Sequence, residues 1–515
     1  MKTVDQQSLQ AILSDLAPRA TIAISGAGGG LLEADAVFAV FERAFLDGGQ
    51  PRDMTLIHAL GMGDRKTRGV NRFAHSGMVR RVVGGHWIWS PAMLEMARTN
   101  QIEAYCMPSG VLTHLFREIG AKRPGLITHV GLGTFCDPRQ AGGRCNEAAR
   151  EPLVELIEID GRTWLRYLPF AIDVAVVRGT VADASGNISA SEEPADLDSY
   201  AIALAAKASG GIVIAQVREM VADGGIRPRE VSIPGNLVDY VLPVADQMQT
   251  YHGAYDPVLA GLAVRDEHQR PIETSSLVRR IVAERAAREL IPDSTVNFGF
   301  GMSADVAQIV ADEGRTSDYW FTIEQGIHRG ELLTGDLFGI AASPAAIMPS
   351  CQQFDLYSGG LLDQTFLGLA EMDAEGSVNV SHFGGQISGP GGFIDISQGA
   401  RRVVFCGAFE AKGLRVSASG GRLTVDQAGA VPKLVTKVEG VTFSGPEARL
   451  RGQKVTYVTE RAVFELTEDG LELTEVAPGV DLRRDILDRM GFEPIMRAPR
   501  AMDEKLFRNV ADKAA

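Results

Sequence analysis

Short apolar runs alternate with helical hydrophobic patterns along the chain. Residues 20–24 form an apolar run that enters a glycine loop, and hydrophobic positions then recur with helical spacing over residues 31–45. Residues 294–298 form a second such run, which passes through a glycine loop into a helical pattern over residues 304–310. Strands that alternate with helices and glycine turns are typical of open α/β sheets. We therefore predict an α/β fold with two related open α/β domains built on a duplicated plan.

A second pair of segments supports the duplication. The sequence DASGNI at residues 183–188 resembles DAEGSV at 373–378, and each is followed by a β-like apolar run. Chance similarity is the competing explanation, because Asp-x-x-Gly turns are common. The predicted division is a first domain over residues 1–245, which is larger and carries an insertion, a polar linker over 246–274, and a second domain over 275–515. An amphipathic helix over residues 275–290 is expected to open the second domain.

The composition narrows the class of protein. The chain has 515 residues, of which 45% are hydrophobic, and its 51 basic against 65 acidic residues give a net charge of −14, which argues against a nucleic-acid partner. No signal-peptide pattern opens the chain, and no apolar stretch has membrane-spanning length. The five cysteines form no CxxC pair, which favours reduced thiols over a disulfide framework or a zinc site. We expect a cytoplasmic protein with no membrane partner and no metal.

The sharpest local feature is a glutamate at the end of an apolar strand. Residues 320–323 (WFTI) run directly into Glu324, and Gly326 can then turn the chain. Ligands of open parallel sheets bind beyond the carboxyl ends of the strands, so Glu324 is placed to face such a crevice. A structural ion pair or an edge position would also explain a carboxylate here.

Residues 384–395 (GGQISGPGGFID) form the densest glycine loop. Backbone N–H groups in a tight loop can bind an oxyanion or a phosphate, although a plain turn between strands is equally compatible with the sequence. Pro390 has no N–H. The donors available near it belong to Gly389, Gly391, Gly392 and Phe393.

Other features suggest anion binding less specifically. Gly299-x-Gly301-x-x-Ala304 fits a loose dinucleotide pattern, but no acidic residue stands out at the ribose position. Walker A, HExxH and GxSxG sequences are absent from the chain. A basic run could receive an anionic cofactor, or form a solvated face or intersubunit salt bridges. It consists of Arg65, Lys66, Arg68, Arg72, Arg80 and Arg81.

Several blocks in one order resemble the class I coenzyme A transferases. The likeness is greatest to the fused acetate, propionate and 3-oxoacid CoA-transferases, and it extends over nearly the whole chain. The blocks are VGLGTFCDPR at 130–139, VREMV at 217–221, IPGNLVD at 233–239, FTIEQG at 321–326, GPGGFID at 389–395 and VAPGVD at 476–481.

The resemblance implies a set of roles. Glu324 would be the covalent nucleophile, the loop from Gly389 to Phe393 would stabilise oxyanions through N–H groups, and the loop with Asn297, Gly299 and Gly301 would shape the same pocket. Coenzyme A would be a substrate, no other cofactor would be needed, and the chain would form a homo-oligomer, either a dimer or a tetramer.

The sequence also departs from the family pattern. Some members carry an oxyanion-binding asparagine after the first glycine loop, where this chain reads LLEAD at residues 31–35. Gln325, His328 and Arg329 after the glutamate are also less usual, and would reshape the acyl pocket.

We therefore expect an enzyme of short-chain fatty acid or ketone body metabolism. It would transfer CoA between a short-chain acyl-CoA and a free acid such as acetate, propionate or a 3-oxoacid, through a glutamyl-CoA thioester. An acyl-CoA hydrolase that uses the same glutamate is the first alternative, and a nucleotide-binding oxidoreductase is the second. A catalytically inactive CoA-binding subunit is disfavoured because Glu324 is present.

Overall fold

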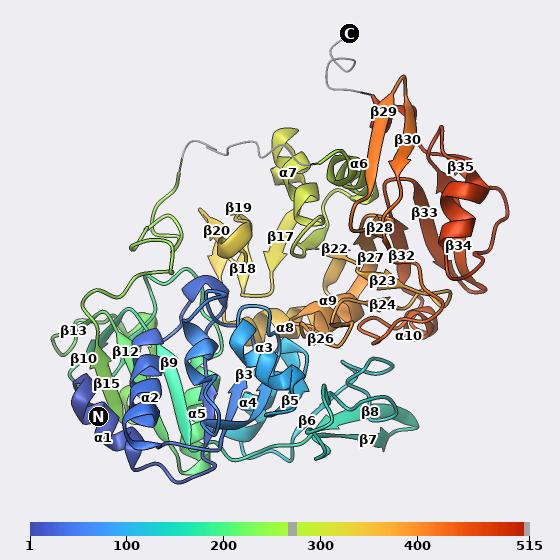
Figure 1. Ribbon diagram of the computed structural model, residues 1–515. Coiled ribbons are helices and arrows are strands. Elements are labelled where there is room, and N and C mark those ends of the chain that lie inside the picture. The colour runs from blue at the N-terminus through green and yellow to red at the C-terminus, as the bar shows by residue number, and fades with distance from the viewer. Residues whose placement is uncertain (266–275, 509–515) are drawn as a thin grey trace. The chain divides into compact units, whose positions relative to one another are not determined.

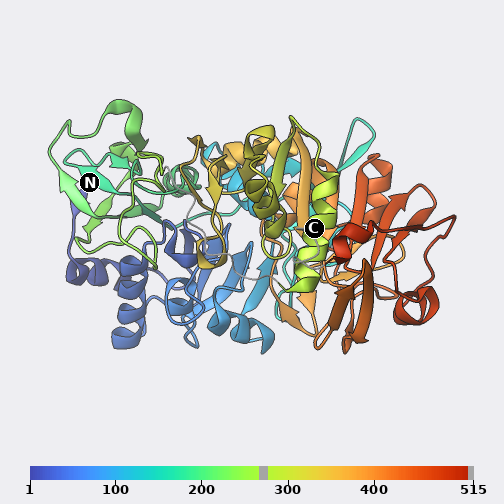
Figure 2. The same ribbon diagram turned by 90° about the horizontal axis from the view of Figure 1, so that it is seen from above.

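The computed structural model describes residues 1–265 and 276–508 (Figures 1 and 2). The chain divides into two compact units. Within the described residues, unit 1 comprises 1–265, 323–355 and 384–395, and unit 2 comprises 276–322, 356–383 and 396–508. The chain thus returns to unit 1 twice after the expected linker, and residues 266–274 of that linker lie outside the described residues. Both returning segments carry residues of the predicted site.

Unit 1 is built on an eight-stranded parallel sheet, visible in blue and green in Figure 1. Its order is β1 (Lys2–Thr3), β15 (Tyr240–Pro243), β12 (Ile212–Val217), β9 (Val174–Arg178), β2 (Thr21–Ile24), β3 (Met54–His58), β4 (Val79–Gly84) and β5 (Glu103–Cys106). The central strands are apolar and buried along their length, as parallel strands covered on both faces are. This sheet confirms the predicted α/β class.

The helices and smaller sheets of unit 1 follow the same alternation. The helices are α1 (Gln6–Ser14), α2 (Asp35–Gly48), α3 (Pro91–Arg98), α4 (Ser109–Gly120) and α5 (Ser199–Ser209). A three-stranded sheet contains β6 (Leu126–Thr128), β8 (Arg162–Tyr167) and β7 (Val154–Ile159). A four-stranded sheet contains β13 (Glu219–Val221), β10 (Val181–Asp183), β11 (Ile188–Ser189) and β14 (Val231–Ile233). Short strands add β18 (Ile327–His328) paired with β21 (Ala346–Ile347), and β19 (Glu331–Leu332) paired with β20 (Ala341–Ala342).

The helix predicted over residues 31–45 begins later than its hydrophobic pattern. Leu31 and Ala27 exchange backbone hydrogen bonds of 3.1 and 2.7 Å, which close the glycine loop and keep residues 31–34 out of the helix. Gly29 and Gly30 have φ of 77° and 86°, which favours glycine at both positions. The helix α2 therefore starts at Asp35.

Unit 2 repeats the plan with a parallel core and an antiparallel extension. Its strands run in the order β17 (Trp320–Ile323), β16 (Thr295–Phe298), β22 (Leu362–Gly368), β27 (Ala400–Cys406), β32 (Lys454–Val458), β33 (Ala462–Thr467), β34 (Gly470–Val476) and β35 (Arg500–Ala501). The predicted helix over 275–290 appears as α6 (Leu277–Ala286) with a further turn over Ala287–Glu289. It lies beside α7 (Ala304–Asp312), and both helices are labelled in Figure 1. The remaining helices are α8 (Ser350–Ser358), α9 (Phe393–Gly399) and α10 (Gly445–Leu450). The residues of α8 and of α9 are divided between unit 1 and unit 2.

The two Asp-x-x-Gly segments have the same geometry in the two units. Asp183 and Asp373 each accept hydrogen bonds on their carbonyl from the glycine three residues later, at 3.0 Å in both cases. Their carboxylates accept the N–H of Asn187 at 2.9 Å and of Ser377 at 3.1 Å. The repeated turn supports a common plan for the two units over a chance likeness.

The core of unit 1 contains side chains from far along the chain. Ile387 and Ile394 belong to the same buried cluster as the sheet residues Ile22, Leu56 and Val82. No helix within the described residues is long and apolar enough to cross a membrane.

Candidate active site

Glu324 follows directly after β17, as the sequence predicts, and begins the first returning segment of unit 1. The residue as a whole is partly exposed. Burial raises the pKa of its carboxyl to about 7, although hydrogen bonds from the Gly392 N–H and the Gln325 side chain act in the opposite direction. A carboxyl with this pKa is ionised in part at neutral pH and is more basic than an ordinary glutamate.

The glycine loop meets this carboxylate at Gly392. A Cβ at position 392 would overlap Oε2 of Glu324, so any side chain there would displace the nucleophile candidate. The Gly392 N–H donates a hydrogen bond to the carboxylate. The structure therefore brings together the carboxylate and one of the loop donors that the sequence singled out.

Two other donors of the loop already have partners in unit 1. The Gly391 N–H donates to the Gly85 carbonyl at 2.7 Å, and the Phe393 N–H donates to the Pro390 carbonyl at 3.0 Å. Neither N–H group is free in this conformation, and each would first have to lose its partner to bind an oxyanion. An oxyanion role for these two residues stays a prediction. Gly389 has φ of 79°, and a Cβ on this residue would lie only 2.6 Å from the Gly85 carbonyl oxygen. That contact explains the glycine without an oxyanion role.

A second buried carboxyl stands next to the site. Asp395 lies in the first turn of α9, is 1% exposed, and accepts the Gly110 N–H at 3.1 Å. Burial raises its pKa to about 7, and the charge of Glu324 adds to that rise. The aromatic side chain of Phe354 approaches both Gly110 and Gly392, so it packs beside both carboxyl sites. Two carboxyl groups in one apolar surrounding resist simultaneous ionisation.

Gln325 packs against the nucleophile candidate. Its Nε2 donates to Oε1 of Glu324 at 3.4 Å, and its own Oε1 has no hydrogen-bond partner within residues 1–265 and 276–508. Gly339 has φ of 105°, and a Cβ there would lie 2.8 Å from the Gln325 amide. The amide is therefore pressed between Gly339 and Glu324.

Known coenzyme A transferases resemble this chain along nearly its whole length. The sequence profile of the coenzyme A transferase family matches residues 6–243. Acetate CoA-transferase YdiF of Escherichia coli is 40% identical over 506 residues, which cover 98% of this chain and 95% of that protein. The chain belongs to the coenzyme A transferase family. It is an enzyme of the fused class I type, with both related α/β parts in one polypeptide.

One further relative and two crystal structures of YdiF support the assignment of this CoA-transferase. Caffeate CoA-transferase of Acetobacterium woodii is 42% identical over 476 residues, with 90% of each chain covered. The crystal structure of the apoenzyme of the Escherichia coli acyl-CoA transferase YdiF matches with a TM-score of 0.92 and 39% identity, over 99% of this chain and 96% of that one. Another crystal structure of that protein holds a thioester complex with CoA and matches with the same TM-score. Membership in this family rules out the alternative of a nucleotide-binding oxidoreductase.

Asn297, Gly299 and Gly301 belong to unit 2 of the CoA-transferase. The Asn297 amide donates to the Thr322 carbonyl at 3.1 Å and accepts from the Thr365 hydroxyl at 3.1 Å, so it ties together neighbouring strands. The Gly299 N–H donates to the Phe366 carbonyl at 2.8 Å, whereas φ of 96° at Gly301 favours glycine in that turn. A role for these three residues in substrate binding stays a prediction.

Most of the basic run is neutralised within the chain. Arg72 pairs with Asp35 at 2.8 Å, and Arg80 pairs with Glu103 at 2.6 Å. Arg65 and Arg81 likewise pair with carboxylates of unit 1, and only Lys66 and Arg68 of the run have no carboxylate partner within the described residues. Intrachain salt bridges therefore explain most of this run.

The first glycine loop leads into a buried glutamate that its local sequence does not mark as part of a site. Glu33 is 0% exposed, and its carboxylate accepts the Gly63 N–H and the Tyr251 hydroxyl, both at 2.8 Å. Burial raises its pKa to about 8. A glutamate directly after an apolar glycine loop was the available signal, but its partners come from distant segments.

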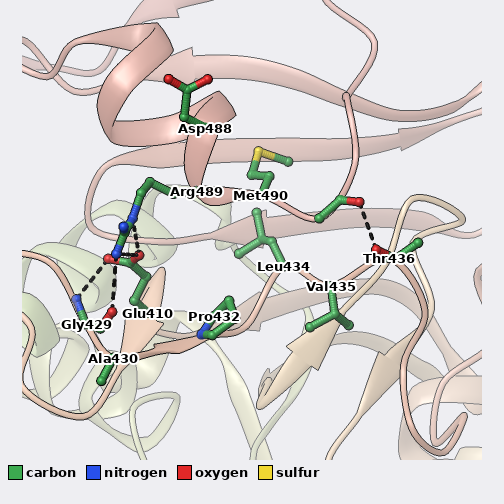
Figure 3. A pocket seen from close by; sticks show the side chains of 11 residues that line it. Glu410, Gly429, Ala430, Pro432, Leu434, Val435, Thr436, Asp488, Arg489 and Met490 are labelled. Carbon is green, nitrogen blue, oxygen red and sulfur yellow. Dashed lines mark hydrogen bonds and ion pairs between the residues drawn. The ribbon is translucent and has the colours of Figure 1, made fainter.

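A surface pocket of unit 2 contains none of the predicted site residues (Figure 3). Its floor is apolar around Leu434 and Val435, and Arg489 enters it as the ion-pair partner of Glu410 at 2.6 Å. The Gly429 N–H also donates to Glu410, at 3.0 Å. Because the charges at this pocket are matched internally, it offers a phosphate or carboxylate ligand no unpaired cation.

Proposed function

We propose that this CoA-transferase exchanges CoA between a short-chain acyl-CoA and a free carboxylic acid through a glutamyl-CoA thioester on Glu324. The observation that carries the proposal is the partly exposed carboxylate held against the Gly392 N–H. The crystal structure of the Escherichia coli relative in a thioester complex with CoA supports it. We also propose a cytoplasmic homo-oligomer, either a dimer or a tetramer.

The first step uses the basicity of Glu324. The ionised carboxylate adds to the thioester carbonyl, the carbonyl oxygen becomes an oxyanion, and collapse expels CoA thiolate and leaves an acyl-glutamyl anhydride. The thiolate then adds to the glutamyl carbonyl and releases the first acid, which leaves the glutamyl-CoA thioester. An acceptor carboxylate reverses these steps, so the exchange consumes no proton, electron or water.

The Gly392 N–H is the backbone donor nearest to the reacting atoms. It donates to the carboxylate in the resting state and can follow that oxygen when the glutamyl carbonyl becomes tetrahedral. One well-placed donor of this kind contributes about 3 kcal/mol to such a transition state. Binding of the long CoA arm supplies remote interaction energy for the same step.

Water would convert the same machinery into an acyl-CoA hydrolase, because an anhydride or a thioester at Glu324 can be hydrolysed. The buried surroundings that raise the pKa of Glu324 and Asp395 favour transfer, since they exclude bulk water. Comparison of CoA release with and without an acceptor acid separates transfer from hydrolysis. Acetate, propionate, a 3-oxoacid and caffeate are the acceptors to compare, because relatives are named for acetate and caffeate.

The decisive experiment measures intact mass after incubation with acetyl-CoA. We expect a gain equal to CoA minus water on the peptide that contains Glu324, reversed by addition of an acceptor acid. The Glu324→Gln variant, with the same shape and no nucleophile, should gain no mass. Steady CoA exchange by an enzyme that never acquires this mass, or that acquires it on another peptide, would overturn the proposal.

A further inference from the structure

Residues 85–87 run beside the glycine loop that contacts the nucleophile. The Gly391 N–H donates to the Gly85 carbonyl at 2.7 Å, and the Trp87 N–H donates to the Ser388 carbonyl at 2.8 Å. These two hydrogen bonds flank His86 and fix its backbone against the loop. All five residues belong to unit 1.

The His86 ring lies between two glycines. Its Cδ2 is 3.8 Å from the position that a Cβ of Gly391 would take, and its Nδ1 is 2.9 Å from the corresponding position at Gly61. Gly391 directly precedes Gly392, whose N–H donates to Glu324. The ring therefore occupies space left by absent side chains, next to the part of the loop that meets the nucleophile.

The segment that follows His86 is itself anchored in unit 1. Trp87 is 1% exposed, and the Ser90 hydroxyl donates to the Met62 carbonyl at 2.6 Å. The Arg65 guanidinium stacks over the Trp89 ring at 4.0 Å. The backbone on both sides of His86 is therefore fixed, and a residue on a rigid segment is well suited to position a ligand.

The His86 imidazole is neutral at physiological pH. The protein packed around the ring lowers its pKa to about 4, and the nearby His58 and Arg65 act in the same direction. A neutral imidazole carries one N–H donor and one acceptor nitrogen. Because the imidazole has no positive charge, it cannot form an ion pair with Glu324. Such an ion pair would stabilise the carboxylate and make it a weaker nucleophile.

His86 differs from other histidines of unit 1 in its hydrogen bonds. Nδ1 of His58 lies 2.7 Å from the Leu60 carbonyl, and Nε2 of His114 lies 2.9 Å from the Cys351 carbonyl. Neither ring nitrogen of His86 has a hydrogen-bond partner in the part of the chain that the structure describes. Its side chain is only partly exposed, and a polar group in such surroundings normally finds a partner.

We infer that His86 is a catalytic residue that donates its imidazole N–H to the carbonyl oxygen of the acyl substrate. The inference rests on the proposed function. When a carboxylate oxygen of Glu324 forms its bond to the thioester carbon, the carbonyl π pair moves onto oxygen, and the His86 N–H stabilises that oxyanion without transferring its proton. The pair returns when the bond to CoA sulfur breaks. His86 thus supplies the substrate oxygen with a donor, while Gly392 serves the glutamyl oxygen.

The test compares three variants by rapid-quench measurement of thioester formation on Glu324 from acetyl-CoA. His86→Ala should form the thioester about 100- to 1000-fold more slowly, the usual effect of losing one oxyanion donor, with a small change in KM for acetyl-CoA. His86→Gln keeps an N–H donor and should recover part of the rate. His86→Phe fills the space without a donor and should remain slow. His75→Ala is the matched control, because His75 pairs with Glu42 outside the site.

The outcomes separate the two proposals. A wild-type enzyme that exchanges CoA without the Glu324 thioester would overturn both. A wild-type enzyme that forms the thioester, together with a His86→Phe variant as fast as His86→Gln, would overturn the His86 inference alone and reduce the ring to a space-filling role. Thermal unfolding of each variant checks folding, and the Gln and Phe pair keeps the comparison decisive if the alanine variant does not fold.

Discussion

Gly392 leaves no space for a side chain beside Glu324. A Cβ at position 392 would overlap Oε2 of the carboxylate, although the backbone at this position needs no left-handed φ. Gly392→Ala should therefore lower exchange at least 100-fold by moving the nucleophile, with a small change in stability. Gly48→Ala is the control, because a Cβ there meets nothing within 4 Å. Near-normal exchange in Gly392→Ala, measured as CoA transfer from acetyl-CoA to propionate, would contradict this geometry.

The pH dependence of exchange should follow the Glu324 carboxyl. Its pKa is raised to about 7, and only the ionised form is nucleophilic. We expect kcat/KM to fall about tenfold per pH unit below pH 6 and to level off above pH 8. The pH profile of the first half-reaction checks this, and a flat profile between pH 5 and 8 would be inconsistent with the raised pKa.

The same raised pKa has a consequence for stability. The Glu324 carboxyl has a higher pKa in the folded protein than its unfolded value of about 4.5. It therefore stabilises the fold below pH 4.5, and this contribution is lost as the pH rises through 7. Glu324→Gln cannot ionise, so it should be more stable than the wild type at pH 8, by on the order of 1–3 kcal/mol, and similar at pH 4. Urea unfolding at the two pH values measures the difference. An equal difference in the free energy of unfolding at pH 4 and pH 8 would indicate a packing effect instead.

Asp395 should tune the nucleophile by its charge. The charge of Glu324 raises the pKa of Asp395, and an Asn side chain at position 395 can still accept the Gly110 N–H. In Asp395→Asn, the acidic limb of the kcat/KM profile should shift to lower pH, because Glu324 no longer faces a second negative charge. The shift of this limb is the readout, since a purely structural loss would lower the rate at every pH alike.

A buried ion network should dominate the stability of unit 2. Arg461 is fully buried, and its Nε donates to Glu460 at 2.7 Å while its guanidinium also approaches Glu410 at 3.5 Å. Arg461→Ala removes the guanidinium that pairs with buried Glu460, whereas Glu410 keeps its ion pair with Arg489, and the change should cost about 3–5 kcal/mol. Arg497→Ala removes a half-exposed guanidinium that pairs with Asp469 and Glu472, and should cost less, about 1 kcal/mol. Urea unfolding compares the two variants, and similar losses would contradict the distinction.

Local sequence could predict the elements but not the partners. The apolar run before Glu324 is sufficient to predict β17 and the position of its carboxylate. The bare glycines of residues 389–392 mark a loop with free donors, yet the carbonyl that occupies the Gly391 N–H belongs to Gly85. No periodicity reports such a long-range pair. For the same reason, His86 looks like part of an aromatic cluster in sequence, and only the fold shows it against the glycine loop.

The route of the chain through unit 1 limits how this enzyme could be divided. Ile387 and Ile394 fill the interior of unit 1, and the loop between them is fastened to Gly85, Trp87 and Ser109. A polypeptide that stopped after residue 265 would carry a hole in its interior. It would also leave the Gly85 carbonyl and the N–H groups of Trp87 and Ser109 without these hydrogen-bond partners. A cut at the linker therefore creates two pieces that must be made together, each completing the other, as in an enzyme assembled from obligate partner polypeptides.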